Sequence, residues 1–292
     1  MRYVEPVFRP PSEAQSLLLQ ATIGCSNNTC TFCGSNLLKK FSIRPLEEIE
    51  QDILEARSIY GGGIRRVFLL DSNALCMKTE DLLEILNLLY AVFPRLDRVG
   101  VYACAADALR KSEEDLRELH KAGLKIAYLG VESGDDVILK RVNKGVNAKQ
   151  TIEGCKKIMN AGITLSVTII LGLGGRERWR ENAIETAKVL NRIDPPYIGA
   201  LTLMVVPGTP LHREVLEGKF QVLNPQEILQ EMRLLVENLE LTNCVFRSNH
   251  ASNYLPLGGT LPADKEDILN VIDLALKKAS RIPLRTEKQR RL

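Results

Sequence analysis

The sequence predicts an α/β protein built on a parallel sheet. Apolar, strand-like runs alternate with helix-like runs over most of the 292 residues, which is the pattern of repeated strand–helix units. With 45% hydrophobic residues the chain can bury a full core, and parallel barrels of this length commonly form one domain. We therefore expect one domain, with a strand–helix core over residues 1–245 and a C-terminal extension, residues 246–292, that packs on this core and is not an independent domain.

The alternation is regular between residues 16 and 210. The expected strands are six apolar runs, residues 16–24, 65–73, 99–107, 125–133, 163–175 and 197–210. The expected helices are residues 43–63, 79–94, 112–123, 148–162 and 180–193. Thr79 and Ser112 are typical helix N-caps, and a run of glycines closes the first helix. Each helix is long enough to connect two parallel strands.

The last third of the chain is less regular. Residues 224–241 predict a helix with Asn224 as its N-cap. Residues 242–262 are dense in polar groups and are predicted to form a loop that contains Arg247, Asn249, His250, Asn253 and Tyr254. Flanking apolar residues favour a loop held against the barrel as a substrate-facing wall, with His250 and Tyr254 as candidate catalytic residues. A plain surface turn is the alternative.

Three cysteines, Cys25, Cys30 and Cys33, fall within nine residues directly after the first predicted strand. Cys thiolates hold iron–sulfur clusters, and a two-residue gap lets one turn direct neighbouring sulfurs at adjacent irons. The other four cysteines and the three histidines are scattered, so a fourth local ligand is missing. We expect a cubane cluster with one open iron. A zinc site, which usually draws on paired ligand units, and a chance group of core cysteines are the alternatives.

This loop resembles that of the radical S-adenosylmethionine (radical SAM) enzymes, which bind a 4Fe-4S cluster after the first barrel strand. Their usual spacing is C-x3-C-x2-C, whereas this chain has C-x4-C-x2-C, and Phe32 stands where they carry an aromatic residue. The resemblance covers roughly residues 16–210 and implies a partial (β/α)6 TIM-like barrel with a C-terminal helical and loop extension. It also implies that the open iron binds S-adenosylmethionine (SAM). Segment similarities favour the coproporphyrinogen oxidase-like and cobalamin-linked branch.

Parallel barrels place their functional groups at the carboxyl ends of the strands. After the second strand stand Asp71, Ser72 and Asn73, whose oxygens can accept hydrogen bonds from a ligand ammonium; a helix-capping turn is the alternative. After the fourth strand stand Glu132 and Ser133. Their segment is similar to those of coproporphyrinogen oxidase-like and methylthiotransferase-like members. The resemblance implies that these two residues contact the ribose hydroxyls or the methionine ammonium of SAM.

Further SAM contacts are implied by position. Twelve residues after the glutamate, relatives carry an arginine that pairs with the methionine carboxylate; here this place belongs to Lys144, with Arg141 as a second cation. A solvated helix face is the alternative for both. Thr168 and Ile170 on the fifth strand match the adenine-contacting region, and Met204 on the sixth would close that pocket. Plain core packing is the alternative for these apolar groups.

The resemblance implies an enzyme that reductively cleaves SAM to a 5'-deoxyadenosyl radical, which then takes a hydrogen atom from a substrate. Cys76 and Cys104, each near a strand end, are candidate hydrogen-atom donors, with structural burial as the alternative. The extra modules of several branches are missing from this sequence, so we expect a small-molecule substrate. The alternative function is a non-catalytic iron–sulfur electron carrier or a haem- or cofactor-chaperone-like protein.

Composition bounds the partners and the compartment. The 39 Lys and Arg against 36 Asp and Glu give a net charge of +3, and the basic excess lies largely in residues 277–291, which we expect to be solvated. Nucleic acid and membrane are therefore not expected as partners, and the N-terminus lacks the apolar core of a signal peptide. A reducing cytoplasm suits the cluster. The expected protein partner is a low-potential electron donor of the ferredoxin or flavodoxin type.

Overall fold

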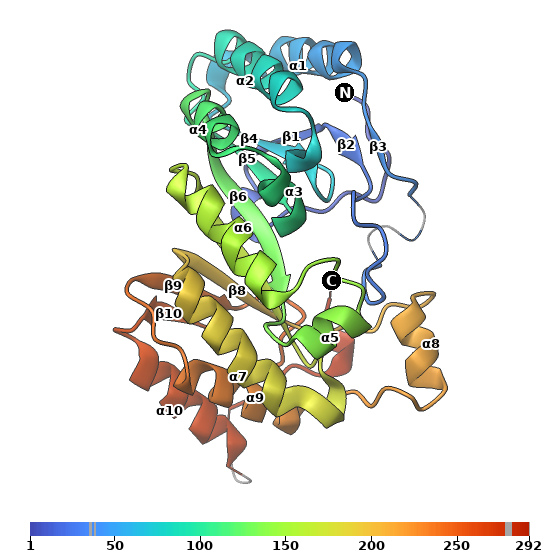
Figure 1. Ribbon diagram of the computed structural model, residues 1–292, viewed down its shortest axis with the longest axis vertical. Helices are drawn as coiled ribbons and strands as arrows, with labels where there is room; N and C mark the ends of the chain where they lie inside the picture. Colours follow the sequence, from blue (N-terminus) through green and yellow to red (C-terminus); the bar gives the residue numbers. More distant parts are fainter. Residues whose placement is uncertain (35–36, 38, 278–281, 292) are drawn as a thin grey trace. The chain divides into compact units, whose positions relative to one another are not determined.

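The computed structural model describes residues 1–34, 37, 39–277 and 282–291 (Figure 1). The chain divides into two compact units. Unit 1 comprises residues 1–28, 35–129 and 153–165, and unit 2 comprises residues 29–34, 130–152 and 166–292. The boundary predicted at residue 245 does not follow this division, because it falls inside the strand β9 (Cys244–Ser248).

Unit 1 is built on parallel strands. They pair in the order β1 (Leu17–Gln20), β4 (Arg66–Leu70), β5 (Arg98–Ala103) and β6 (Leu124–Glu132). The helices that follow them are α1 (Leu46–Tyr60), α2 (Thr79–Val92), α3 (Ala105–Arg110) and α4 (Glu113–Lys121). The first four predicted strands are thereby confirmed, with ends that differ from the predicted ones by one to four residues. The short helix α3 was not predicted.

Two predicted helix caps have different outcomes. Ser112 caps α4, since its hydroxyl accepts a hydrogen bond from the Asp115 amide at 2.9 Å in a reciprocal capping box. Thr79 does not cap α2, because the helix begins one residue earlier than expected and Lys78 holds the N-cap position. The Thr79 hydroxyl instead accepts a hydrogen bond from the buried Lys111 ammonium at 3.2 Å.

The core of unit 1 is partly aromatic. Phe68 and Leu70 on β4 pack with Ile126 and Tyr128 on β6. Phe68 meets the Tyr128 ring edge-on at a centroid distance of 5.6 Å, a favoured geometry for aromatic pairs. These side chains all lie on one face of the strands, which fixes the register of β4 against its neighbours.

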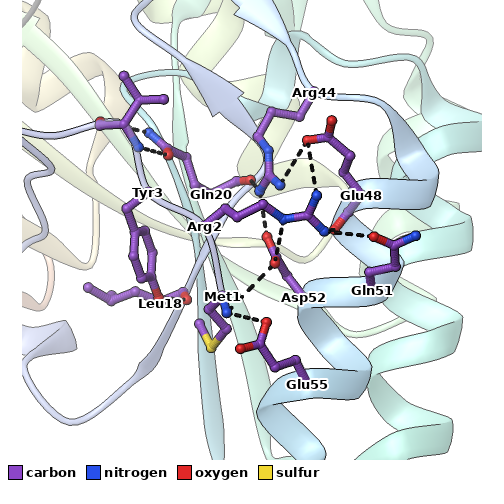
Figure 2. Close-up of polar contacts among 11 residues, drawn as sticks. Met1, Arg2, Tyr3, Leu18, Gln20, Arg44, Glu48, Gln51, Asp52 and Glu55 are labelled. Atoms are coloured by element: carbon purple, nitrogen blue, oxygen red, sulfur yellow. Dashed lines mark hydrogen bonds and ion pairs between the residues drawn. The ribbon is translucent and has the colours of Figure 1, made fainter.

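Figure 2 shows the polar network that anchors α1 to this sheet. The buried guanidinium of Arg44 donates to the backbone oxygen of Gln20 at 2.7 Å and to the Asp52 carboxylate at 2.8 Å. Arg2 adds a hydrogen bond to the other Asp52 oxygen at 3.3 Å. A small antiparallel pair, β2 (Thr22–Ile23) with β3 (Ser42–Ile43), lies next to this network. Arg44 directly follows β3 and Gln20 lies two residues before β2, so the network holds in place both strands that flank the cysteine loop.

Unit 2 continues the alternation of strands and helices. Its strands β7 (Thr164–Leu171), β8 (Tyr197–Thr202) and β9 are parallel, and β10 (Leu257–Leu261) is antiparallel to β9. Its helices are α5 (Asp136–Arg141), α7 (Gly175–Ile193), α8 (Pro210–Leu216), α9 (Pro225–Glu237) and α10 (Lys265–Leu276). A further helix, α6 (Ala148–Asn160), has its first five residues in unit 2 and the others in unit 1. The N-cap predicted for α9 is confirmed, because Asn224 accepts a hydrogen bond from the Glu227 amide at 3.0 Å.

Strands β9 and β10 lie where the sequence predicts a loop, and that prediction was wrong for these residues. A strand with one buried face needs an apolar or small residue only at every second position. Cys244, Phe246 and Ser248 are buried, whereas Arg247 between them is exposed. The polarity of the segment as a whole concealed this alternation.

The basic tail is also ordered where the structure describes it. Arg290 is only 6% exposed and donates hydrogen bonds to the backbone oxygens of Leu203 and Ser252 at 2.8 and 2.6 Å. It also donates to the Tyr254 hydroxyl at 2.7 Å. The predicted solvation therefore holds for Lys288 and Arg291, which are exposed, but not for Arg290, which is buried. The predicted tail from 278 to 281 lies outside the described residues.

Among the described residues, no helix combines the length and the apolarity needed to cross a bilayer.

We expect Phe68→Ala to lower the free energy of unfolding by about 3–5 kcal/mol, because Phe68 is fully buried and its removal leaves a cavity. Leu216→Ala, at a side chain that is 74% exposed, should change it by less than about 0.5 kcal/mol. Denaturant titration followed by circular dichroism measures both. A similar small effect from the two variants would contradict the described core.

Candidate functional site

The ends of the cysteine loop meet at a buried ion pair in unit 1. The Lys39 ammonium lies 2.6 Å from Asp71 Oδ2, and both side chains are almost fully buried. The same oxygen accepts a hydrogen bond from the Gly24 amide at 3.2 Å. Asp71 therefore ties the residue before Cys25 to the far end of the loop. The contact with a ligand ammonium that we predicted for Asp71 stays a prediction, since Oδ2 is held by Lys39 and Oδ1 accepts from Ser72.

A second polar group in unit 1 holds the residue after Cys25. Asn73 is fully buried, and its amide nitrogen donates to Asp107 Oδ2 and to Ser26 Oγ, each at 2.5 Å. Its amide oxygen accepts from the Cys104 backbone at 3.1 Å. The predicted SAM contact of Asn73 also stays a prediction, and both ends of this amide are engaged within the protein. Ser72 is half-buried.

Both candidate hydrogen-atom donors lie in this part of unit 1. Cys76 ends the short 3-10 helix Ala74–Cys76, and Cys104 follows β5 directly, at the N-cap position of α3; both are half-buried. Burial, together with the charges of Asp107 and Cys25, raises the pKa of the Cys76 thiol to about 12.

The second half of the cysteine loop belongs to unit 2. The two residues between Cys30 and Cys33 form a turn in which the Cys33 amide donates to the Cys30 backbone oxygen at 3.3 Å. The Thr31 amide donates to the Val142 oxygen at 3.0 Å, which fixes the turn to the end of α5. Phe32 packs against a buried group that includes Ile138, Val142 and Leu173, with Ile170 and Leu203 beside it. The turn is thus held by both its backbone and its aromatic side chain.

Glu132 and Lys144, predicted from sequence as two separate SAM contacts, form an ion pair with each other. Lys144 Nζ lies 2.8 Å from Glu132 Oε1, and the side chains are 11% and 13% exposed. Glu132 has a left-handed backbone (φ +64°), which turns its carboxylate back over Gly130. A Cβ at Gly130 would lie 1.9 Å from Glu132 Oε1, so this position requires glycine for the observed pair. Arg141 points elsewhere, to Glu214 and Glu177.

A buried polar network lies behind Glu132. Ser133 is fully buried and donates to the Asn182 amide oxygen at 2.6 Å. Asn182 in turn donates to the Glu231 carboxylate at 2.6 Å and to the Ile170 backbone oxygen at 3.2 Å. Glu231 also accepts from the Gly172 amide at 2.8 Å. One carboxylate on α9 therefore supports the ends of both β6 and β7.

The remaining candidates are spread over unit 2. Thr168 and Ile170 lie on the half-buried face of β7, whose other face is buried, and Met204 follows β8 with similar exposure. His250 is half-buried, and burial together with Arg285 lowers its pKa. Tyr254 is 4% exposed, and its hydroxyl bonds to Glu287 and Arg290. The Tyr254 hydroxyl therefore contacts the C-terminal segment and does not face an open surface in this structure.

The donor set fits an iron–sulfur cluster. Three thiol groups on one short loop supply soft ligands for iron, and histidine or carboxylate side chains do not interrupt the loop. Within the described ranges, no group of three His, Cys, Asp or Glu side chains is close enough to hold a metal ion. Cys25 belongs to unit 1 and the other two cysteines to unit 2, so the fit rests on ligand chemistry and sequence spacing.

A comparison with protein families decides the assignment. Residues 19–187, more than half of the chain, match the radical SAM superfamily, and the match contains the whole cysteine loop. The chain belongs to the radical SAM superfamily. The family resemblance of the cysteine loop is thereby confirmed.

Relatives of this radical SAM protein differ in what they do. A protein of Methanocaldococcus jannaschii is 22% identical over 94% of this chain and 76% of its own length. The tRNA-2-methylthio-N(6)-dimethylallyladenosine synthase of Treponema denticola is 28% identical over 59% of this chain and 40% of its own. The heme chaperone HemW of Bacillus subtilis is 23% identical over 71% and 55%. Another M. jannaschii protein is 31% identical over 46% of this chain and 41% of its own. The matched part is thus about half or less of three of these relatives.

Two solved structures show the fold. Coproporphyrinogen III oxidase (HemN) from Escherichia coli has a TM-score of 0.59 and is 17% identical over 76% of this chain and 52% of its own. Methylornithine synthase (PylB) has a TM-score of 0.54 and is 17% identical over 77% and 63%. The radical SAM chain therefore has the predicted α/β fold, the partial TIM-like barrel of these neighbours.

Several residues that organise the site were missed by sequence reasoning. Lys39 and Asp107 pair with predicted residues from distant positions, and no local pattern marks them. Glu231 did leave a signal, because it interrupts the apolar face of α9 between Ile228 and Leu235. A charged residue on a buried helix face predicts either a polar network or a functional group.

We expect Lys39→Met to lower the free energy of unfolding by about 3–5 kcal/mol, since it leaves the Asp71 carboxylate buried without a counter-ion. The double variant Lys39→Met/Asp71→Asn should recover most of this loss, because a neutral amide needs no counter-ion and can still accept from Gly24. Denaturant titration of the three proteins checks the prediction. A double variant as unstable as the single one would rule out the ion pair as the cause.

Burial raises the pKa of Glu231 from 4.5 to about 8, while hydrogen bonds from Asn182 and Gly172 act to lower it. The folded state therefore binds a proton more tightly than the unfolded chain, so this group's contribution to stability falls as pH rises from about 4.5 to about 8. We expect the wild type to lose more unfolding free energy than Glu231→Gln between about pH 5.5 and pH 8. Both proteins share all other titrating groups. Parallel pH profiles of the two would refute the assignment.

Proposed function

We propose that this chain is a radical SAM enzyme that acts on a small molecule. The observation that carries the proposal is the C-x4-C-x2-C loop inside the matched superfamily region. Cys25, Cys30 and Cys33 would hold a 4Fe-4S cluster. When bound, the cluster and SAM supply a 5'-deoxyadenosyl radical that takes a hydrogen atom from the substrate. A cytoplasmic location is part of the proposal, because an open-iron cluster requires a reducing compartment.

The Glu132–Lys144 pair supports recognition of the methionine end of SAM. An amino acid group carries an ammonium and a carboxylate, and the pair offers a carboxylate for the first and an ammonium for the second, on side chains that are largely buried. In our proposal the ligand carboxylate takes the place of Glu132 on Lys144, while its ammonium takes the place of Lys144 on Glu132. Each side chain then exchanges one charged partner for another, so neither charge is left unpaired.

The buried groups around the pair have supporting roles in the proposal. The Glu231 network keeps Ser133 and the end of β7 in place, so that Glu132 and Ile170 approach a ligand from fixed backbone positions. Cys76 stands at the end of the short 3-10 helix that follows β4 and is our candidate hydrogen-atom donor. Substrate identity is carried by none of these groups, and the small-molecule class rests on the expectation from the sequence.

The test is anaerobic cluster reconstitution followed by incubation with SAM and dithionite. We expect 5'-deoxyadenosine to form, and Cys30→Ala and Cys33→Ala to lose both the cluster and this product. Cys155→Ala, at a buried cysteine outside the loop, should keep both. Glu132→Gln and Lys144→Met should raise the KM for SAM by about 10- to 100-fold, the effect of losing one charge-assisted hydrogen bond, with unchanged iron content. If the reconstituted wild type formed no 5'-deoxyadenosine, the proposed radical SAM activity would be refuted.

A haem- or cofactor-chaperone-like function is the second candidate. It is favoured by the similarity to the B. subtilis heme chaperone over 71% of this chain. The same experiment separates the two functions, because a chaperone of this kind would bind a cluster and form no 5'-deoxyadenosine. Haem titration of the reconstituted protein, followed by its absorption spectrum, then tests the chaperone directly.

A further inference from the structure

The turn that carries Cys30 and Cys33 rests on the segment that follows β8 in unit 2. The backbone oxygen of Thr31 accepts a hydrogen bond from the Leu211 amide, in the first turn of α8, at 3.0 Å. This bond is a second backbone link of the turn, beside its link to the end of α5. We name residues 203–211, which reach from the end of β8 into α8, the turn seat.

Two further contacts join the cysteine turn to the turn seat. Gly34 directly follows the last cysteine, and a Cβ built there would lie 2.6 Å from Cγ1 of Val206. The glycine therefore lets the backbone pass directly over Val206. Leu203, the first residue of the seat, packs on the same apolar cluster as Phe32 and Ile170. The position of the seat thus affects both the cysteine turn and the candidate adenine contact on β7.

The turn seat is held in turn by Arg290 of the C-terminal segment. The Arg290 guanidinium donates to the backbone oxygens of Leu203 and Ser252 at 2.8 and 2.6 Å. It also lies over the ring of Tyr254, with its central carbon 4.2 Å from the ring centroid. Because Arg290 is buried, water competes little for these hydrogen bonds, and the bond to Leu203 fixes the start of the seat.

A second arginine of the same segment bonds elsewhere. Arg285 donates to the backbone oxygens of His250 and Asn253 at 2.9 and 3.1 Å. The Asn253 amide donates in turn to the Ala200 oxygen on β8 at 2.9 Å. Among the hydrogen bonds of the described residues, Arg290 is thus the one of these two arginines that bonds to the turn seat.

We propose that Arg290 is a positioning residue for the cysteine turn. It holds Leu203, and the turn seat then keeps Cys30 and Cys33 together for cluster binding. The inference rests on the proposed function for the cluster itself, whereas the contacts that carry it belong to the chain alone. Arg290 lies beyond residue 187, where the match to the superfamily ends, so this support comes from the chain's own C-terminal segment.

The first test compares Arg290→Met with Arg285→Met, a matched control that also loses two hydrogen bonds to backbone oxygens. The measurement is iron release from the reconstituted protein to an excess of chelator, without SAM or reductant. We expect Arg290→Met to release iron about tenfold faster than the wild type, the effect of losing one charge-assisted hydrogen bond. Arg285→Met should release iron at the wild-type rate. Denaturant titration selects a temperature at which both variants are folded.

A second measurement uses the cluster-free protein. Alkylation of Cys30 and Cys33 by iodoacetamide, followed by mass spectrometry, should be faster in Arg290→Met than in the wild type and Arg285→Met. The reason is that a displaced seat leaves the turn less constrained. Cys155 is buried outside the loop and serves as the internal control, with the same slow alkylation in all three proteins.

Gly34→Ala tests the turn seat without a change at Arg290. The added Cβ collides with Val206, so iron release and alkylation of the turn should both become faster. The double variant Gly34→Ala/Val206→Ala should return toward the wild-type rates, because it removes the two Val206 methyl groups that the new Cβ meets.

Wild-type rates of iron release and alkylation in a folded Arg290→Met would overturn the proposal. An equal acceleration by Arg285→Met would overturn it too, because the effect would then belong to the C-terminal segment as a whole. If Arg290→Met does not fold, wild-type rates in Gly34→Ala decide against the turn seat. Failure of the proposed function has a different signature, a wild type that takes up no iron or forms no 5'-deoxyadenosine, and the alkylation rates then still decide the role of Arg290.

Discussion

The buried ion pair between Lys39 and Asp71 is the constraint on which the candidate site depends. A loop that carries metal ligands has to keep them together before the metal binds, and polar loops of this length have little core of their own. Here the Asp71 carboxylate holds both the backbone amide of Gly24, directly before Cys25, and the ammonium of Lys39, at the far end of the loop. Since removing either partner leaves a buried charge, the interaction is costly to break. The free-energy cost of leaving either charge buried without its partner therefore keeps the two ends of the loop together.

Other buried polar groups repeat this principle around the site. Asn73 satisfies both ends of its amide while holding Ser26 and the Cys104 backbone. Glu231 and Asn182 support the ends of β6 and β7 in the same way. Buried polar groups are tolerated only when their hydrogen bonds are made, so each network fixes the backbone that it touches. Residues that do not meet a ligand in our proposal thus determine where Glu132 and Ile170 stand.

The fold was predictable because it depends on periodicity and alternation. The six predicted strands correspond to β1, β4, β5, β6, β7 and β8. Strand β9 was missed because the segment was judged by its overall polarity. Arg247 and its polar neighbours raise that polarity, although every second residue of the strand is buried. The cysteine loop was predictable from ligand type and spacing alone. Its partners were not, because Lys39 meets Asp71 across 32 residues through tertiary packing that no local pattern records.

The absence of a side chain at Gly130 has a consequence for engineering the chain. The volume that a methyl group would need there is taken by the Glu132 carboxylate, with Lys144 Nζ only 3.0 Å from the same point. Because the obstructing atoms belong to flexible ends and not to the backbone, alanine at this position would act as a wedge that parts the two charges while the strand remains intact. A single methyl group at residue 130 thus offers a way to keep the Glu132 and Lys144 side chains apart without altering either ionised residue.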